Sequence, residues 1–101
     1  MIKIGSHDIK IIFAELDEDN AKFDWSKNTI TIEETLPPDQ MFSALIHEIL
    51  HVCNSTLDST DLGHALLDSL SEQLSSVLIA NDMIDKVWYD KFVNRKPPFL
   101  L

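Results

Sequence analysis

Residues 36–53 read LPPDQMFSALIHEILHVC, and this stretch predicts an amphipathic helix over residues 38–53. Proline's fixed φ and missing N–H suit the first turn of a helix, where the Asp39 carboxylate would also meet the positive end of the helix dipole. Apolar residues then recur at steps of three and four: Phe42, Leu45, Ile46, Ile49 and Cys53. This spacing is that of a stripe facing the core, so we expect the helix to pack against the rest of the protein.

The same helix carries the motif HExxH, as His47-Glu48-Ile49-Leu50-His51. Residues four apart lie on one face of a helix, with Cβ atoms about 5–6 Å apart, so both imidazoles can bind one metal ion. Glu48 lies one step round the helix, where it can reach a water on the metal without binding the metal itself. The motif therefore predicts a zinc site with a metal-activated water and Glu48 as its general base.

A catalytic zinc site usually has three protein ligands, so a third must come from elsewhere in the chain. His64 is the first candidate, because it lies at the start of the next predicted helix, after a connection long enough to turn the chain back. Asp68 and Glu72, one and two turns further on, share roughly the same face and are the alternatives. Each residue also has a purely structural alternative. His64 could cap the start of the helix, and Asp68 and Glu72 could form its solvent-exposed face.

The residues before the helix predict a small sheet. Residues 1–16 are rich in isoleucine and are interrupted by a turn-like segment at 5–8, which indicates a hairpin or two short strands. Residues 22–34 again favour strands, most strongly Thr29–Glu33, where alternation places Ile30 and Ile32 on one face.

Two further helices are expected after it. The first begins between Asp61 and His64 and ends near Asn81, with a core-facing stripe of Leu66, Leu67, Leu70, Leu74, Val77 and Leu78. The second covers residues 82–94 and stops before Pro97 and Pro98. The predicted fold is α+β: a three- to four-stranded sheet packed on the HExxH helix and a second helix, with a third C-terminal helix. Residues 1–101 form one domain, in which 95–101 are a basic and apolar tail.

Composition narrows the classes of partner. A chain of 101 residues has room for one core. Its net charge of −9 argues against nucleic acid, because binding to phosphates depends on Lys and Arg. No stretch is apolar for long enough to cross a bilayer, and the single Cys53 fits a reducing compartment. We therefore expect a cytoplasmic protein that binds neither nucleic acid nor membrane.

The chain resembles the very small zincin-like metallopeptidases of bacteriophages and bacteria, in which a few strands precede an HExxH helix and a second helix. The likeness rests on residues 29–32, 47–51 and 70–81, and it covers about residues 1–82. A weaker likeness to SprT-like proteins, in which a downstream histidine completes the site, also points to His64. The resemblance implies a minimal zincin-like fold, bound zinc, and hydrolysis of a peptide bond in a peptide or protein substrate.

The resemblance also implies that the strand nearest the active-site helix has an exposed edge. We expect an extended peptide to add to Thr29–Glu33 as an extra strand and to place its carbonyl beside the metal. The alternative function is a zinc-binding or vestigial zincin-fold module that acts through protein contacts and has no peptidase activity. In that case residues 95–101 could dock on an acidic partner.

Overall fold

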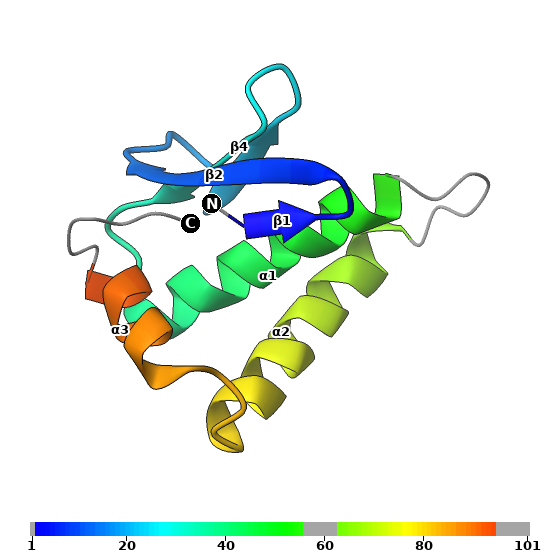
Figure 1. The fold of residues 1–101 in the computed structure, drawn as a ribbon. Helices are drawn as coiled ribbons and strands as arrows, with labels where there is room; N and C mark the ends of the chain where they lie inside the picture. The colour runs from blue at the N-terminus through cyan, green and yellow to red at the C-terminus, as the bar shows by residue number, and fades with distance from the viewer. Residues whose placement is uncertain (1, 56–62, 95–101) are drawn as a thin grey trace.

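The computed structural model describes residues 2–55 and 63–94, which form an α+β fold (Figure 1). Four strands come first: β1 (Ile2–Ile4), β2 (His7–Ala14), β3 (Ala21–Asp24) and β4 (Thr29–Glu33). Three helices follow: α1 (Pro38–Ser55), α2 (His64–Ala80) and α3 (Lys86–Asn94). The predicted sheet followed by three helices is confirmed. The tail at 95–101 and the predicted helix start at Asp61 lie outside the described residues.

The four strands form one mixed sheet in the order β1-β2-β4-β3. β2 and β4 are parallel, whereas β1 pairs antiparallel with β2 and β3 pairs antiparallel with β4. β4 is therefore hydrogen-bonded on both sides, and the expectation that Thr29–Glu33 offers an exposed edge is wrong. The reason is the strand order. β3 precedes β4 in the sequence but pairs with its outer side, so β4 lies between β2 and β3. Within the described residues, the edges of the sheet are β1 and β3.

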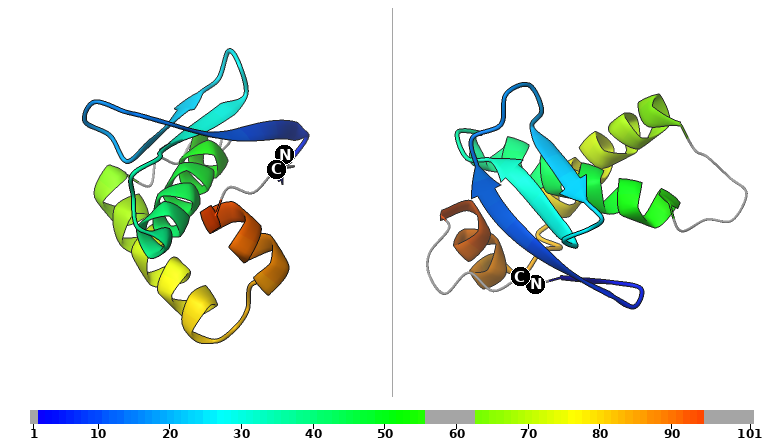
Figure 2. Two further views of the ribbon diagram at one scale, coloured as in Figure 1. Left: turned by 90° about the vertical axis from the view of Figure 1, so that its left-hand side faces the viewer. Right: turned by 90° about the horizontal axis from the view of Figure 1, so that it is seen from above.

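The core lies between one face of the sheet and the helices. The register aligns Ile11, Ile30 and Phe23 in one row across β2, β4 and β3. Ile30 and Ile32 are fully buried, which confirms that they share the core-facing side. Both views of Figure 2 place the three helices on the same side of the sheet. None of the helices in residues 2–55 and 63–94 combines the length and the apolar character that crossing a membrane requires.

Helix α1 packs against the sheet, but not through the whole predicted stripe. Its buried residues are Met41, Phe42, Ala44, Leu45, Glu48 and Val52. Cys53 is exposed, contrary to prediction. Successive helical residues are rotated by about 100°, so burial of Val52 turns Cys53 away from the core. Helix α3 closes the other end of the core through Phe92, whose ring centroid lies 5.6 Å from that of Phe13.

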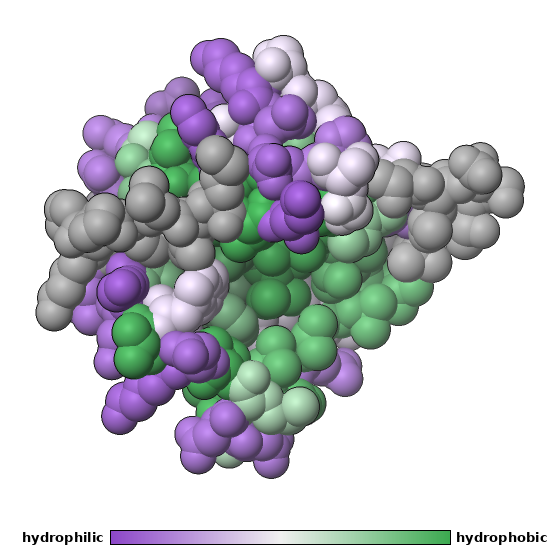
Figure 3. All heavy atoms as spheres, viewed as in Figure 1, coloured by the Kyte–Doolittle hydropathy of each residue, from purple (hydrophilic) through white to green (hydrophobic). Residues whose placement is uncertain are grey.

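The predicted core stripe of α2 is only partly right. Leu67 is buried, but the other two buried residues of α2 are serines, Ser71 and Ser75. Their hydroxyls donate to carbonyl oxygens of the preceding turn, at 2.8 and 2.6 Å, so their burial leaves no hydroxyl donor unsatisfied. Leu78 is half-buried against the core, whereas four other residues of the stripe are 41–49% exposed: Leu66, Leu70, Leu74 and Val77. Figure 3 shows this apolar surface along α2. Small serines allow α2 to approach α1 closely. The side of α2 that carries Ser71 and Ser75 is therefore buried, and the side that carries the exposed leucines is not.

Candidate metal centre

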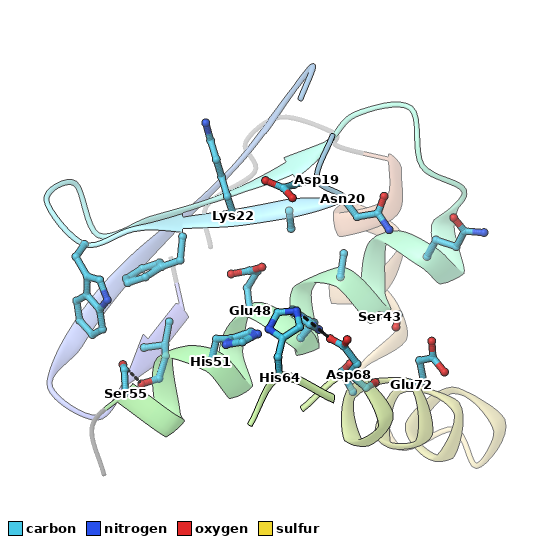
Figure 4. Close-up of a pocket in the computed structure, with 18 residues that line it drawn as sticks. Asp19, Asn20, Lys22, Ser43, Glu48, His51, Ser55, His64, Asp68 and Glu72 are labelled. Carbon is cyan, nitrogen blue, oxygen red and sulfur yellow. Dashed lines mark hydrogen bonds and ion pairs between the residues drawn. The ribbon is translucent and has the colours of Figure 1, made fainter. Parts of the chain in front are cut away.

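Three histidines converge where the first turn of α2 meets the C-terminal half of α1. His47, His51 and His64 each offer one nitrogen, and these three atoms lie within 4.8 Å of one another. The ring centroids are 4.5 Å apart for His47 and His51, 5.3 Å for His47 and His64, and 4.8 Å for His51 and His64. Figure 4 shows His51 and His64 together beneath Glu48. In the described part of the chain, this is the group of side chains that could hold a metal ion.

The local backbone explains why His64 faces α1. Gly63 precedes α2 with φ of 81°, a left-handed conformation that glycine adopts without strain. Gly63 is the N-cap residue, so the alternative prediction that His64 caps the helix is wrong. His64 instead begins the helix, with its side chain 71% exposed at the mouth of the site.

The donor set could hold a metal ion. Three imidazoles are a common ligand set for a catalytic zinc ion, with Zn–N distances of about 2.0–2.1 Å. In tetrahedral geometry such nitrogens lie about 3.4 Å apart, so the rings would have to approach one another by up to about 1.4 Å. The exposed His64 has the freedom to make that movement. Burial lowers the pKa of His47, as does the positive charge of His51, and this favours the neutral imidazole that binds metals.

Asp68 and Glu72 take different places from His64. Asp68 Oδ1 lies 2.9 Å from His47 Nδ1 and 3.6 Å from His64 Nε2. It is thus placed to accept a hydrogen bond from the Nδ1–H of His47, which leaves Nε2 for a metal. Glu72 lies beyond Asp68, away from the histidines (Figure 4). Of the three candidates for third ligand, the geometry favours His64 and makes Asp68 a partner of the ligands.

Glu48 is a buried carboxyl beside the histidines. It is only 8% exposed, and its side chain points toward β3, on the same side as Asp19 (Figure 4). Burial raises the pKa of Glu48 to about 7, and the negative charge of Asp19 adds to this effect while His64 opposes it. A carboxyl that titrates near neutral pH can both accept and release a proton, as a general base requires.

The histidines lie in the middle of a cleft of about 880 Å³. The floor is one face of α1, from Gln40 to Ser55. One wall is β3 with its neighbours, and the other is the first half of α2. The size falls in the usual range of small-molecule sites, about 300–1,000 Å³, and the open ends leave room for an extended chain.

Among the lining residues that were not singled out from the sequence are Asp19, Phe23 and Trp25. Phe23 in β3 and Trp25 in the turn after it are aromatic residues two positions apart, a weak signal that could have drawn attention to them. Nothing in the sequence marks Asp19, which is one of several acidic residues in a loop.

Comparison with known proteins gives no relative: no protein-family model matches the chain, and neither does any curated protein or solved structure. The resemblance to the small zincin-like metallopeptidases therefore stays a prediction, and it rests on the residues quoted above.

Proposed function

We propose that this protein is a zinc-dependent metallopeptidase. The observation that carries the proposal is the convergence of three imidazoles from two helices beside a buried glutamate, in a cleft that is open along a strand edge. Each feature alone has a structural explanation. Their combination supplies ligands, a base and a place for substrate within a single site.

His47, His51 and His64 would hold the zinc ion. When bound, zinc supplies Lewis acidity, which lowers the pKa of water and polarises the scissile carbonyl. Glu48 would take the proton from the attacking water and deliver it to the leaving amine, and its position beside the histidines (Figure 4) suits it to this task. Asp68 would hold the His47 ring through its contact with Nδ1 and leave Nε2 available as a ligand atom.

The substrate would bind along β3 rather than along β4. Residues Ala21–Asp24 form the edge strand that borders the cleft, and an exposed edge can accept an extended peptide as an additional strand. Backbone pairing of this kind brings a peptide carbonyl near the histidines with little demand on sequence. The expected substrate is therefore an extended or unfolded segment of a peptide or protein.

The decisive experiment compares zinc-loaded wild type with Glu48→Gln on an unfolded protein such as casein, with products identified by mass spectrometry. We expect cleavage by the wild type and loss of cleavage in Glu48→Gln, because the amide cannot accept the proton. The variant should keep its zinc, which distinguishes loss of the base from loss of the site. Equal cleavage by both proteins would reject the assigned role of Glu48.

A second candidate function has an observation of its own. The exposed flank of α2, formed by Leu66, Leu70, Leu74 and Val77, is the kind of apolar surface that marks protein contacts. A zinc-binding or vestigial module would use this flank and have no peptidase activity. Retention of zinc without cleavage of any substrate would favour this reading. The cytoplasmic location stays a prediction, as does the lack of nucleic-acid and membrane partners.

A further inference from the structure

The two ends of the cleft differ in character. In Figure 4, β3 runs from Asn20 past Lys22 in the direction of Ser55, the last residue of α1. Phe23 and Trp25 follow Lys22 and line the cleft, so they belong to the end near Ser55. The opposite end, near Ser43, has the acidic residues Asp68 and Glu72 on its α2 wall. The histidines lie between the two ends.

The aromatic end has an exposed tryptophan that is held in place. Trp25 is 49% exposed, yet its ring is packed edge-to-face against Phe23, with centroids 4.7 Å apart, and lies 5.8 Å from His7. The turn that carries it is fixed as well, because Ser26 donates from its N–H and its hydroxyl to Asp24 Oδ1, at 2.9 and 2.6 Å. A side chain ordered on both sides loses little entropy when it binds a ligand.

The orientation of β3 directs this aromatic surface into the cleft. Phe23 is in register with Ile30, which is fully buried on the core side of the sheet, so Phe23 faces α1. Lys22 lies on the other face, as strand alternation requires, and in Figure 4 it points away from the histidines. The cleft floor at this end includes Val52, but Val52 is only 1% exposed, so Phe23 and Trp25 supply the accessible apolar surface.

We propose that Phe23 and Trp25 form a subsite for one large apolar or aromatic side chain of the peptide substrate. This inference rests on the proposed function and adds the substrate class to it. A peptide lying along β3 places alternate side chains toward α1, and the one beside Trp25 meets an apolar wall. A large side chain cannot find an equivalent wall at the acidic end. Cleavage therefore occurs at a fixed distance from an apolar residue.

The fluorescence of Trp25 provides a test that does not depend on activity. The chain has two tryptophans, and Trp88→Phe leaves Trp25 as the single indole. The variant is combined with Glu48→Gln, loaded with zinc, and titrated with two synthetic peptides that differ only in one position, Leu or Ser. We expect the Leu peptide to shift Trp25 emission to shorter wavelength, because it excludes water from the indole, and to bind about tenfold more tightly than the Ser peptide.

Hydrolysis provides the second readout, with variants of the otherwise unmodified chain. Trp25→Ala should reduce cleavage of the Leu peptide to the level of the Ser peptide, and Trp25→Phe should restore most of the preference. Ile12→Ala is the matched control, because Ile12 is 45% exposed but does not line the cleft. It should preserve the preference, and all three variants should keep one zinc per chain.

The outcomes separate the two proposals. Equal binding and cleavage of the Leu and Ser peptides, with unchanged Trp25 emission, would overturn the subsite and leave the peptidase assignment standing. If no peptide binds and the wild type cleaves none, both proposals fail. A preference for Leu that survives Trp25→Ala would likewise remove Trp25 from the subsite.

Discussion

Replacement of Asp68 should weaken zinc binding although Asp68 is not assigned as a ligand. Its Oδ1 atom lies 2.9 Å from His47 Nδ1, which fixes the ring orientation and increases the electron density on Nε2. Loss of such a partner typically reduces metal affinity about 10- to 100-fold. The Asp68 side chain is 49% exposed, so solvent screens its charge and the lower end of this range applies. We therefore expect Asp68→Ala to bind zinc about tenfold more weakly, equivalent to about 1.4 kcal/mol.

Competition with a chromophoric chelator measures this change. Asp68→Asn keeps an oxygen acceptor but loses the charge, so its affinity should lie between those of the wild type and Asp68→Ala. Glu72→Gln is the matched control, because Glu72 lies one turn further along α2, lines the cleft and is not part of the histidine cluster. Unchanged zinc affinity in Asp68→Ala would refute the orienting role. Loss of zinc from Glu72→Gln would instead make Glu72 the third ligand.

Two further predictions concern the fold. Leu67→Ala should lower the free energy of unfolding by about 2–5 kcal/mol, because it opens a cavity between α1 and α2, whereas Leu74→Ala, at a 41% exposed site, should cost less than about 1 kcal/mol; equal losses in urea denaturation would contradict the orientation of α2. Backbone N–H bonds from Leu16 and Thr35 hold the pKa of Glu33 below its usual value of 4.5. A lowered folded-state pKa stabilises the fold above the unfolded pKa, and this contribution is lost as the pH falls through the folded pKa. The wild type should therefore have a higher thermal midpoint than Glu33→Gln at neutral pH, and this difference should shrink below about pH 4. A difference that does not depend on pH would count against the bonds to Glu33.

Local patterns in the sequence were sufficient to place the HExxH helix. Its proline start, apolar spacing and histidine pair all depend on residues within a few turns of one another, and the structure has this helix at Pro38–Ser55. The choice between His64, Asp68 and Glu72 could not be made in the same way. They share one face of α2, so only the packing of α2 on α1 decides which of them meets His51.

Two of the errors in the fold, on the edge of the sheet and on the buried flank of α2, have the same kind of cause. The sequence pattern clearly predicted a strand at Thr29–Glu33. The position of this strand in the sheet depends on the pairing of β3 with its outer side. In α2, leucines and serines form neighbouring flanks, and hydrophobicity alone favours burial of the leucines. The serine flank is buried because its small side chains allow a close helix contact and its hydroxyls bond within the helix. Both outcomes depend on contacts between segments far apart in the chain.

Zinc content tests the central claim most directly. Elemental analysis of protein purified without added metal and then loaded with zinc should give one zinc per chain for the wild type and for Glu48→Gln. His51→Ala and His64→Ala should lose it, since each removes one of three converging nitrogens. A wild type that takes up no zinc would contradict the metal centre, and retention of zinc in His64→Ala would contradict the ligand set.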